Sequence, residues 1–193
     1  MIQAGDVIEN PVTGERLIFR ETSRETNGEA VVVETFVKPD GFVAAAHVHP
    51  QQEERFVILR GTVGFRLGRE KMVAGPGQKV TVPAGTAHKF WNAGEDEAHF
   101  VCEVRPALQF EQLIETMFGL AADGKTNRKG MPNPLRLAVI ARHHFDDVRL
   151  PFPPAWMQRM GLALGAPLGR VLGYEATYVV AGVDSVQPVT ESA

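Results

Sequence analysis

The segment HVHPQQEERF, from His47 to Phe56, holds the residues of this chain that are best suited to chemistry. His47 and His49 are two positions apart, so on an extended chain both rings point to one face and can reach one ion. Glu53 and Glu54 follow, and only one of two adjacent residues can share that face. The segment therefore suggests a metal site, although an HxH pair alone also occurs in ordinary surface strands and turns.

The alternation of the next strand bears on the choice between the two glutamates. Glu54 shares a face with Phe56 and Ile58, whereas Glu53 shares one with Arg55. If Phe56 lies in the interior, Glu54 is the inward carboxylate.

Short apolar segments with alternating or β-branched character run from Asp6 to about Arg105, separated by glycine, asparagine and proline. This pattern predicts an all-β domain of the sandwich or barrel kind. The predicted strands are ERLIFRET, EAVVVETFV, RFVILRG, TVGFRLG, QKVTVPAG, AHKFWN and AHFVCEVR.

The pattern changes after Pro106, where apolar residues take helical spacing. We predict one helix over residues 107–122 and a second in PLRLAVIARHHF, whose proline suits a first helical turn. The segment AWMQRMGLALGAPLGRVLGYEA predicts two short helices divided near Pro167. The chain is thus expected to comprise a β-barrel domain, residues 1–106, and a helical extension, residues 107–193, that packs on the barrel or on a partner subunit.

Four glycines of this region, Gly161, Gly165, Gly169 and Gly173, recur every fourth residue and would form a stripe of small residues on a helix. Each glycine costs about 1 kcal/mol of helix stability relative to alanine. A loop rich in small residues is therefore one interpretation. We favour the broken pair of helices, held by close packing of the stripe, because the leucines of the same segment need cover.

Two groups of residues have a characteristic spacing. The first group is Gly41, His47, His49, Glu54 and Gly61, and the second is Gly77, Pro83, Gly85, His88 and Asn92. With these motifs the chain closely resembles the cupin superfamily, specifically the small single-domain cupins of the conserved-barrel, or cupin 2, type. The spacing from Gly61 independently selects Glu54. The resemblance covers roughly the first hundred residues, and the helical part is similar to extensions on some bacterial cupins of unassigned function.

The resemblance implies an antiparallel jelly-roll β-barrel and one divalent transition metal ion held by His47, His49, Glu54 and His88. Three neutral imidazoles and one carboxylate suit Fe, Mn, Ni, Zn or Cu, without a choice among them. Four protein ligands leave one or two positions open on a five- or six-coordinate ion, which chemistry requires. An ion that only stiffens the barrel or orients a bound molecule is the alternative.

Strand alternation places an apolar set of side chains beside these ligands. The expected substrate pocket consists of Val43, Ala45, Phe56, Ile58, Phe90 and Cys102. A sugar phosphate would need cationic groups there, and the alternation places none. We therefore predict a quercetinase-like, metal-dependent dioxygenase whose small, largely apolar or aromatic substrate chelates the ion through oxygen, with Glu54 also serving as a base. A non-catalytic small-molecule-binding or sensor cupin is the alternative.

The other candidate side chains fit a site less well. His99 is expected on the outer face of its strand, because the alternate set that includes Cys102 is more apolar. Cys102 is then a small buried residue rather than a nucleophile. His143 and His144 lie at a predicted helix end, where we expect them to be solvated or to cap the helix.

Composition restricts the partners. A net charge of −3 without blocks of like charge indicates neither a nucleic-acid surface nor a membrane-binding patch. A DNA-binding regulator is the least favoured function, because the helical part has no basic recognition helix. The single cysteine excludes an internal disulfide, and the N-terminus has no signal-peptide pattern, so we expect a cytoplasmic protein. By the same resemblance, we expect a homodimer.

Overall fold

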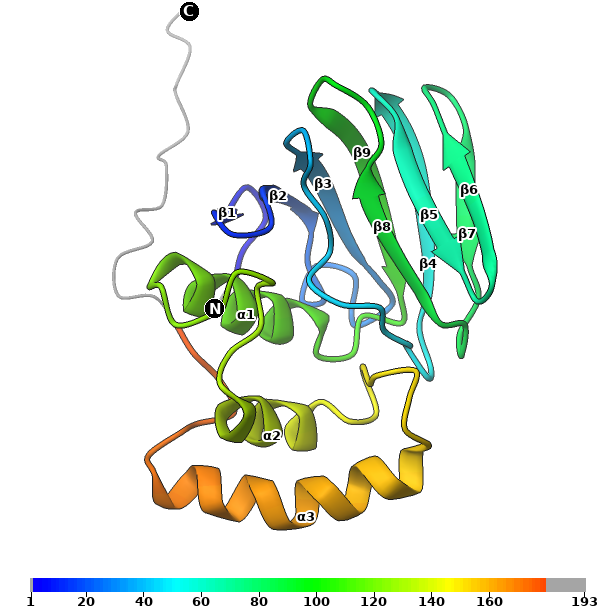
Figure 1. Ribbon diagram of the computed structural model, residues 1–193. Helices are drawn as coiled ribbons and strands as arrows, with labels where there is room; N and C mark the ends of the chain where they lie inside the picture. The colour runs from blue at the N-terminus through cyan, green and yellow to red at the C-terminus, as the bar shows by residue number, and fades with distance from the viewer. Residues whose placement is uncertain (1, 180–193) are drawn as a thin grey trace, which may run out of the picture.

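Nine strands and three helices make up residues 2–179, the part of the chain that the computed structural model describes (Figure 1). The strands are β1 (Val7–Asn10), β2 (Glu15–Glu21), β3 (Val31–Val37), β4 (Glu53–Arg60), β5 (Val63–Leu67), β6 (Glu70–Ala74), β7 (Lys79–Val82), β8 (His88–Asn92) and β9 (Ala98–Arg105). The helices are α1 (Phe110–Ala122), α2 (Pro134–His143) and α3 (Ala155–Val171).

The strands form two antiparallel sheets with the core between them. The larger sheet has the order β1-β2-β3-β9-β4-β7, and the smaller one β6-β5-β8. Residues 42–48 continue the smaller sheet through bridges from Phe42 to Trp91 and from His47 to His88. The predicted antiparallel barrel with a helical extension is therefore confirmed.

Every second side chain of the central strands fills the core. β3 and β9 each bury alternate residues, the pattern of a sheet with one face in the interior. The ring of Phe56 in the larger sheet lies 5.1 Å from that of Phe65 in the smaller sheet, so the two sheets meet directly. Phe100 and Cys102 point inward from β9, as the sequence predicts, and both are buried.

Two strands, β1 and β6, were not among those predicted. β1 has only four residues, which is too short for a convincing alternation. β6 lies at the edge of the smaller sheet and is exposed along most of its length, so its side chains carry no pattern of burial. Pairing with a neighbouring strand, rather than local sequence, makes these segments strands.

The first two helices lie close to their predicted positions. α1 begins at Phe110 rather than at residue 107, because Leu108 has a φ of 46°, which a right-handed helix excludes. α2 begins at Pro134, as predicted, and the Asn133 side chain caps it by accepting hydrogen bonds from the amides of Leu135 and Arg136.

The prediction of two short helices divided near Pro167 is wrong. α3 is one helix of 17 residues that contains Pro167. This proline is exposed, and it removes only one backbone hydrogen bond from the helix. Close packing against α2 offsets that loss. A Cβ atom on Gly169 would lie 2.5 Å from the Leu135 carbonyl oxygen, and one on Gly165 would lie 3.1 Å from the Ala138 Cβ.

The centre of the glycine stripe is therefore a packing surface, but it contacts α2. At its ends, Gly161 and Gly173 have open space around them. In Figure 1, α2 lies between α3 and the rest of the molecule, and α1 lies between α2 and β1. The helices thus form layers under one end of the barrel. Among residues 2–179, no helix is both long and apolar enough to cross a membrane.

Candidate metal centre

The predicted ligand side chains come from residues 47–54 and from the first residue of β8, and the fold brings these two segments together. The backbones of His47 and His88 exchange two hydrogen bonds of 2.9 Å, which sets their rings side by side. Glu54 is the second residue of β4 and is buried, whereas the adjacent Glu53 turns outward and pairs with Arg55 at 2.6 Å. His47, His49, Glu54 and His88 each offer one ligand atom, and these atoms lie within 4.8 Å of one another.

Hydrogen bonds select the same ring nitrogen of each histidine to face the centre. Nδ1 of His47 lies 2.9 Å from the Ala45 carbonyl oxygen, and Nδ1 of His88 lies 3.0 Å from that of Thr86. A carbonyl oxygen can only accept, so each Nδ1 carries the proton. Each Nε2 therefore keeps its lone pair for an ion, which is how proteins prepare histidine ligands.

His49 is oriented by two residues outside the predicted site. Its Nδ1 lies 2.9 Å from Oε1 of Gln52 and 2.9 Å from the backbone oxygen of Asp147. The Gln52 amide cannot turn freely, because its Nε2 donates to the carbonyl oxygens of Pro106 and Ala107, both at 3.0 Å. Gln52 shares the inward face with Glu54, and that alternation was the one sequence signal for its role.

The donor atoms are arranged to bind a metal ion rather than to form hydrogen bonds with one another. Nε2 of His88 and Oε2 of Glu54 are 2.6 Å apart, yet their geometry does not make a directed hydrogen bond, and both atoms are buried without a partner. An ion at the point on which they converge would satisfy both. Buried polar atoms otherwise find partners in folded proteins, so this pair fits a metal.

The protonation states of His47 and Glu54 also suit an ion. For His88, the effect of burial is outweighed by Glu54, which raises the pKa of the ring, so His88 must lose its proton when an ion binds. Burial lowers the pKa of His47 to about 3, and the neighbouring His88 and His49 add to that shift. Burial alone would raise the pKa of Glu54, but the nearby His49 and His88 outweigh it and lower the pKa to about 2. A neutral imidazole and an ionised carboxylate are the forms that bind metals.

The centre lies on the wall of a cavity of about 590 Å³. Of the predicted pocket residues, Val43, Ala45, Phe56, Phe90 and Cys102 line it. Ile58 does not, because it is fully buried in the core. Burial also raises the pKa of the Cys102 thiol, consistent with an unreactive wall residue.

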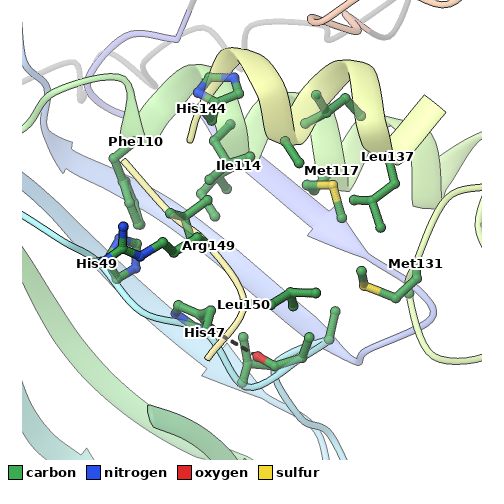
Figure 2. A pocket seen from close by; sticks show the side chains of 18 of the residues that line it. His47, His49, Phe110, Ile114, Met117, Met131, Leu137, His144, Arg149 and Leu150 are labelled. Atoms are coloured by element: carbon green, nitrogen blue, oxygen red, sulfur yellow. Dashed lines mark hydrogen bonds between the residues drawn. The ribbon is translucent and has the colours of Figure 1, made fainter. Parts of the chain in front are cut away.

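The helical extension supplies the opposite wall, which the sequence did not predict. Figure 2 shows His47 and His49 on one side of the cavity and apolar side chains of the extension, among them Ile114, Met117 and Leu137, on the other. The extension therefore covers the metal centre with a mostly apolar surface.

Several polar side chains of the cavity wall were also not predicted. They are Asn10, Glu15, Thr35, His144, Arg149 and Gln158. Strand alternation predicts no cationic side chain in the cavity, but the connection between α2 and α3 brings Arg149 to its wall.

His144 is the C-cap residue of α2, one of the two roles expected for the histidines at this helix end, but it is not solvated. His143 is exposed, whereas His144 is completely buried, with Nδ1 3.1 Å from Oδ2 of Asp147. Burial lowers the pKa of His144, so the ring is held in its neutral form. His99 is outside the site, on the outer face of β9, where it stacks on Phe36 at 4.2 Å.

A family model and a curated relative match this chain in sequence. Residues 33–104 match the family Cupin_2, described as cupin domain. The chain is 28% identical over 180 residues to a protein named probable oxidoreductase virH from Hypocrea virens, and the match covers 82% of this chain and 79% of that protein.

Solved structures resemble about half of the chain. A predicted oxalate decarboxylase from Thermotoga maritima has 17% identity and a TM-score of 0.48, covering 55% of this chain and 98% of its own. KdgF from a Halomonas species has 16% identity and a TM-score of 0.45, covering 51% of this chain and 84% of its own. The family match, the two facing sheets and the motif residues gathered at one centre agree: the β-barrel of this chain is a small cupin-type domain.

Proposed function

We propose that this protein is a metal-dependent oxidoreductase of the dioxygenase type, acting on a small, largely apolar or aromatic substrate that chelates the ion through oxygen. One observation carries the proposal: three histidine Nε2 atoms and one carboxylate converge on the wall of a cavity that is otherwise mostly apolar. The similarity to a protein named as a probable oxidoreductase supports the same class of chemistry.

His47, His49, Glu54 and His88 would hold the ion, which when bound supplies Lewis-acid and redox chemistry. The carbonyl oxygens of Ala45 and Thr86 keep two of the rings in the binding tautomer. The apolar walls contributed by Phe56, Phe90 and the helices exclude water and bind the body of the substrate through its apolar surface.

Glu54 would also accept a proton from an acidic hydroxyl of the substrate. Its carboxylate is ionised at neutral pH and lies at the centre, so a hydroxyl that approaches the ion meets a base. In a dioxygenase reaction O2 is the oxidant and both of its atoms enter the products, so the cavity need not hold a separate reductant.

The test is the protein loaded in turn with Fe(II), Mn(II), Ni(II), Cu(II) and Zn(II), each confirmed by elemental analysis. Under anaerobic conditions, 3-hydroxyflavone, catechol and acetylacetone are added, and their absorption spectra are recorded. Air is then admitted and oxygen uptake is measured. We expect a spectral shift for at least one probe and oxygen uptake with at least one redox-active ion.

The matched variants Glu54→Gln and Glu53→Gln serve as controls, because only the first changes the centre. Binding without oxygen uptake for every ion would favour a non-catalytic binding protein. The absence of binding for every probe would contradict the proposed substrate class.

A further inference from the structure

The hairpin of β1 and β2 places two polar side chains next to each other on the cavity wall, away from the metal centre. Asn10 and Glu15 are direct cross-strand partners. Both line the cavity, and their exposed fractions are only 3% and 7%. Cross-strand partners have Cβ atoms about 5 Å apart, so the two side chains can contact one bound group.

Asn10 presents a hydrogen-bond donor to the cavity. Its Oδ1 accepts from the amides of Val12 and Thr13, both at 3.1 Å, and these two contacts identify the oxygen and fix the orientation of the amide. Nδ2, the other atom of the amide, has no hydrogen-bond acceptor among the described residues.

Glu15 presents an acceptor beside it. Its Oε2 accepts a hydrogen bond of 2.7 Å from the Thr13 hydroxyl. Within residues 2–179, Oε1 has no donor. Burial raises the pKa of Glu15 to about 7, with the Thr13 hydroxyl opposing the shift. A carboxyl group in this environment is satisfied only by a further polar partner.

Two other polar residues of the wall have partners on the chain. Nε2 of Gln158 donates to the Leu150 and Pro153 carbonyl oxygens, and Nδ1 of His144 pairs with Asp147, although the buried Nε2 of His144 has no partner among residues 2–179. A donor or acceptor that lies in a mostly apolar wall without a partner is unfavourable. Asn10 leaves a donor and Glu15 leaves an acceptor without a partner, at neighbouring positions. A ligand hydroxyl can satisfy both, because it donates one hydrogen bond and accepts another.

The strand register shows how far this pair lies from the metal centre. Glu54 is opposite Val104 on β9, whereas Glu15 is opposite Val37, and Val37 is opposite Ala98 on β9. The six residue-to-residue steps from Ala98 to Val104 span about 20 Å of strand at about 3.3 Å per residue. A molecule that reaches both places must be elongated, since the side chains bridge only part of this distance.

We propose that Asn10 and Glu15 bind a hydroxyl group at the end of the substrate remote from the metal, with the hydroxyl donating to Glu15 and accepting from Asn10. This inference rests on the proposed function and specifies its substrate class: elongated, largely apolar molecules with a metal-chelating oxygen at one end and a hydroxyl at the other.

The test compares 3-hydroxyflavone with 3,4′-dihydroxyflavone, which adds one hydroxyl remote from the chelating oxygens. Dissociation constants are measured by calorimetry on the Zn(II)-loaded protein, because zinc is not redox-active and the probes are not consumed. We expect the dihydroxy compound to bind at least 10-fold more tightly to the native protein. In Glu15→Leu that preference should fall to about 2-fold or less, with zinc content and the affinity for 3-hydroxyflavone unchanged.

Glu15→Gln is the second variant, should Glu15→Leu not fold. Thr13 can still donate to its amide oxygen, but the remaining NH2 cannot accept the ligand hydroxyl, so the preference should also fall. Glu9→Gln makes the same chemical change on the exposed face of β1 and should keep the full preference.

Equal binding of both probes by the native protein, or an unchanged preference in both Glu15 variants, would overturn this inference and leave the proposed function standing. If the native protein binds neither probe, that result contradicts both the proposed class of chelating substrate and this inference.

Discussion

Nδ1 of His49 lies 2.9 Å from the backbone oxygen of Asp147, a residue 98 positions later in the chain. The connection between α2 and α3 thereby contacts a side chain of the metal centre. Two further bonds hold that connection in place, because Val48, the residue between the two histidines, exchanges backbone hydrogen bonds of 2.8 and 3.0 Å with Arg149. The helical extension thus helps to build the centre as well as to cover it.

The two adjacent glutamates should differ sharply in metal binding. Glu54→Gln removes a buried carboxylate at the centre, whereas Glu53→Gln changes a side chain that pairs with Arg55 on the outside. After loading and dialysis, elemental analysis should find the first variant largely free of metal and the second with the native content. Equal metal content in both would refute the assigned strand face.

Gln52 should matter for metal affinity although its side chain is not a ligand. Gln52→Leu removes the acceptor that orients His49, and losses of such orienting groups typically cost 10–100-fold in affinity. A competition assay with a zinc-sensitive dye would measure the dissociation constant on folded protein. Gln51→Leu, a change of the exposed neighbouring glutamine, is the control and should leave the affinity unchanged. An unaltered affinity in Gln52→Leu would mean that Asp147 alone orients the ring.

The buried Glu15 should make the metal-free protein less stable as the pH rises. Its pKa is 4.5 in the unfolded chain and about 7 in the fold. The unfolded state therefore releases the proton first, and the native state loses about 3 kcal/mol relative to it between these two pH values.

Urea unfolding at pH 4.5 and pH 8, in the presence of a chelator, would measure this effect as the difference between native protein and Glu15→Gln. The variant has no carboxyl group to ionise at this position and should lack this part of the pH dependence. Parallel stability curves for the two proteins would contradict the assigned burial of Glu15.

Two glycines of α3 should respond in opposite ways to the same substitution. Gly169→Ala would place a Cβ 2.5 Å from the Leu135 carbonyl oxygen, and such overpacking costs about 1–3 kcal/mol. Gly161→Ala meets open space and should stabilise the helix by up to about 1 kcal/mol. Thermal unfolding of both variants would show a lower midpoint for the first and an unchanged or higher one for the second. Equal thermal midpoints for the two variants would mean that α3 can move away from α2 without a measurable loss of stability.

The strand pattern of the sequence predicted the all-β domain, and the resemblance to the cupin superfamily predicted the four side chains gathered at its centre. Strand alternation is local, because neighbouring side chains of an extended chain must point to opposite faces, so Glu54 could be separated from Glu53 before any contact was known. The apolar residues Phe100 and Cys102 likewise decided which face of β9 points inward and left His99 outside.

Only the tertiary structure decided what surrounds that centre. The burial of His144 depends on what packs over the end of α2, and the orientation of His49 depends on a carbonyl group far along the chain. Glu15 lies in a segment with ordinary strand alternation, so no local signal marks it as a cavity residue. Pro167 stays within α3 because Gly165 and Gly169 allow close packing on α2, and such long-range packing overrides a local preference.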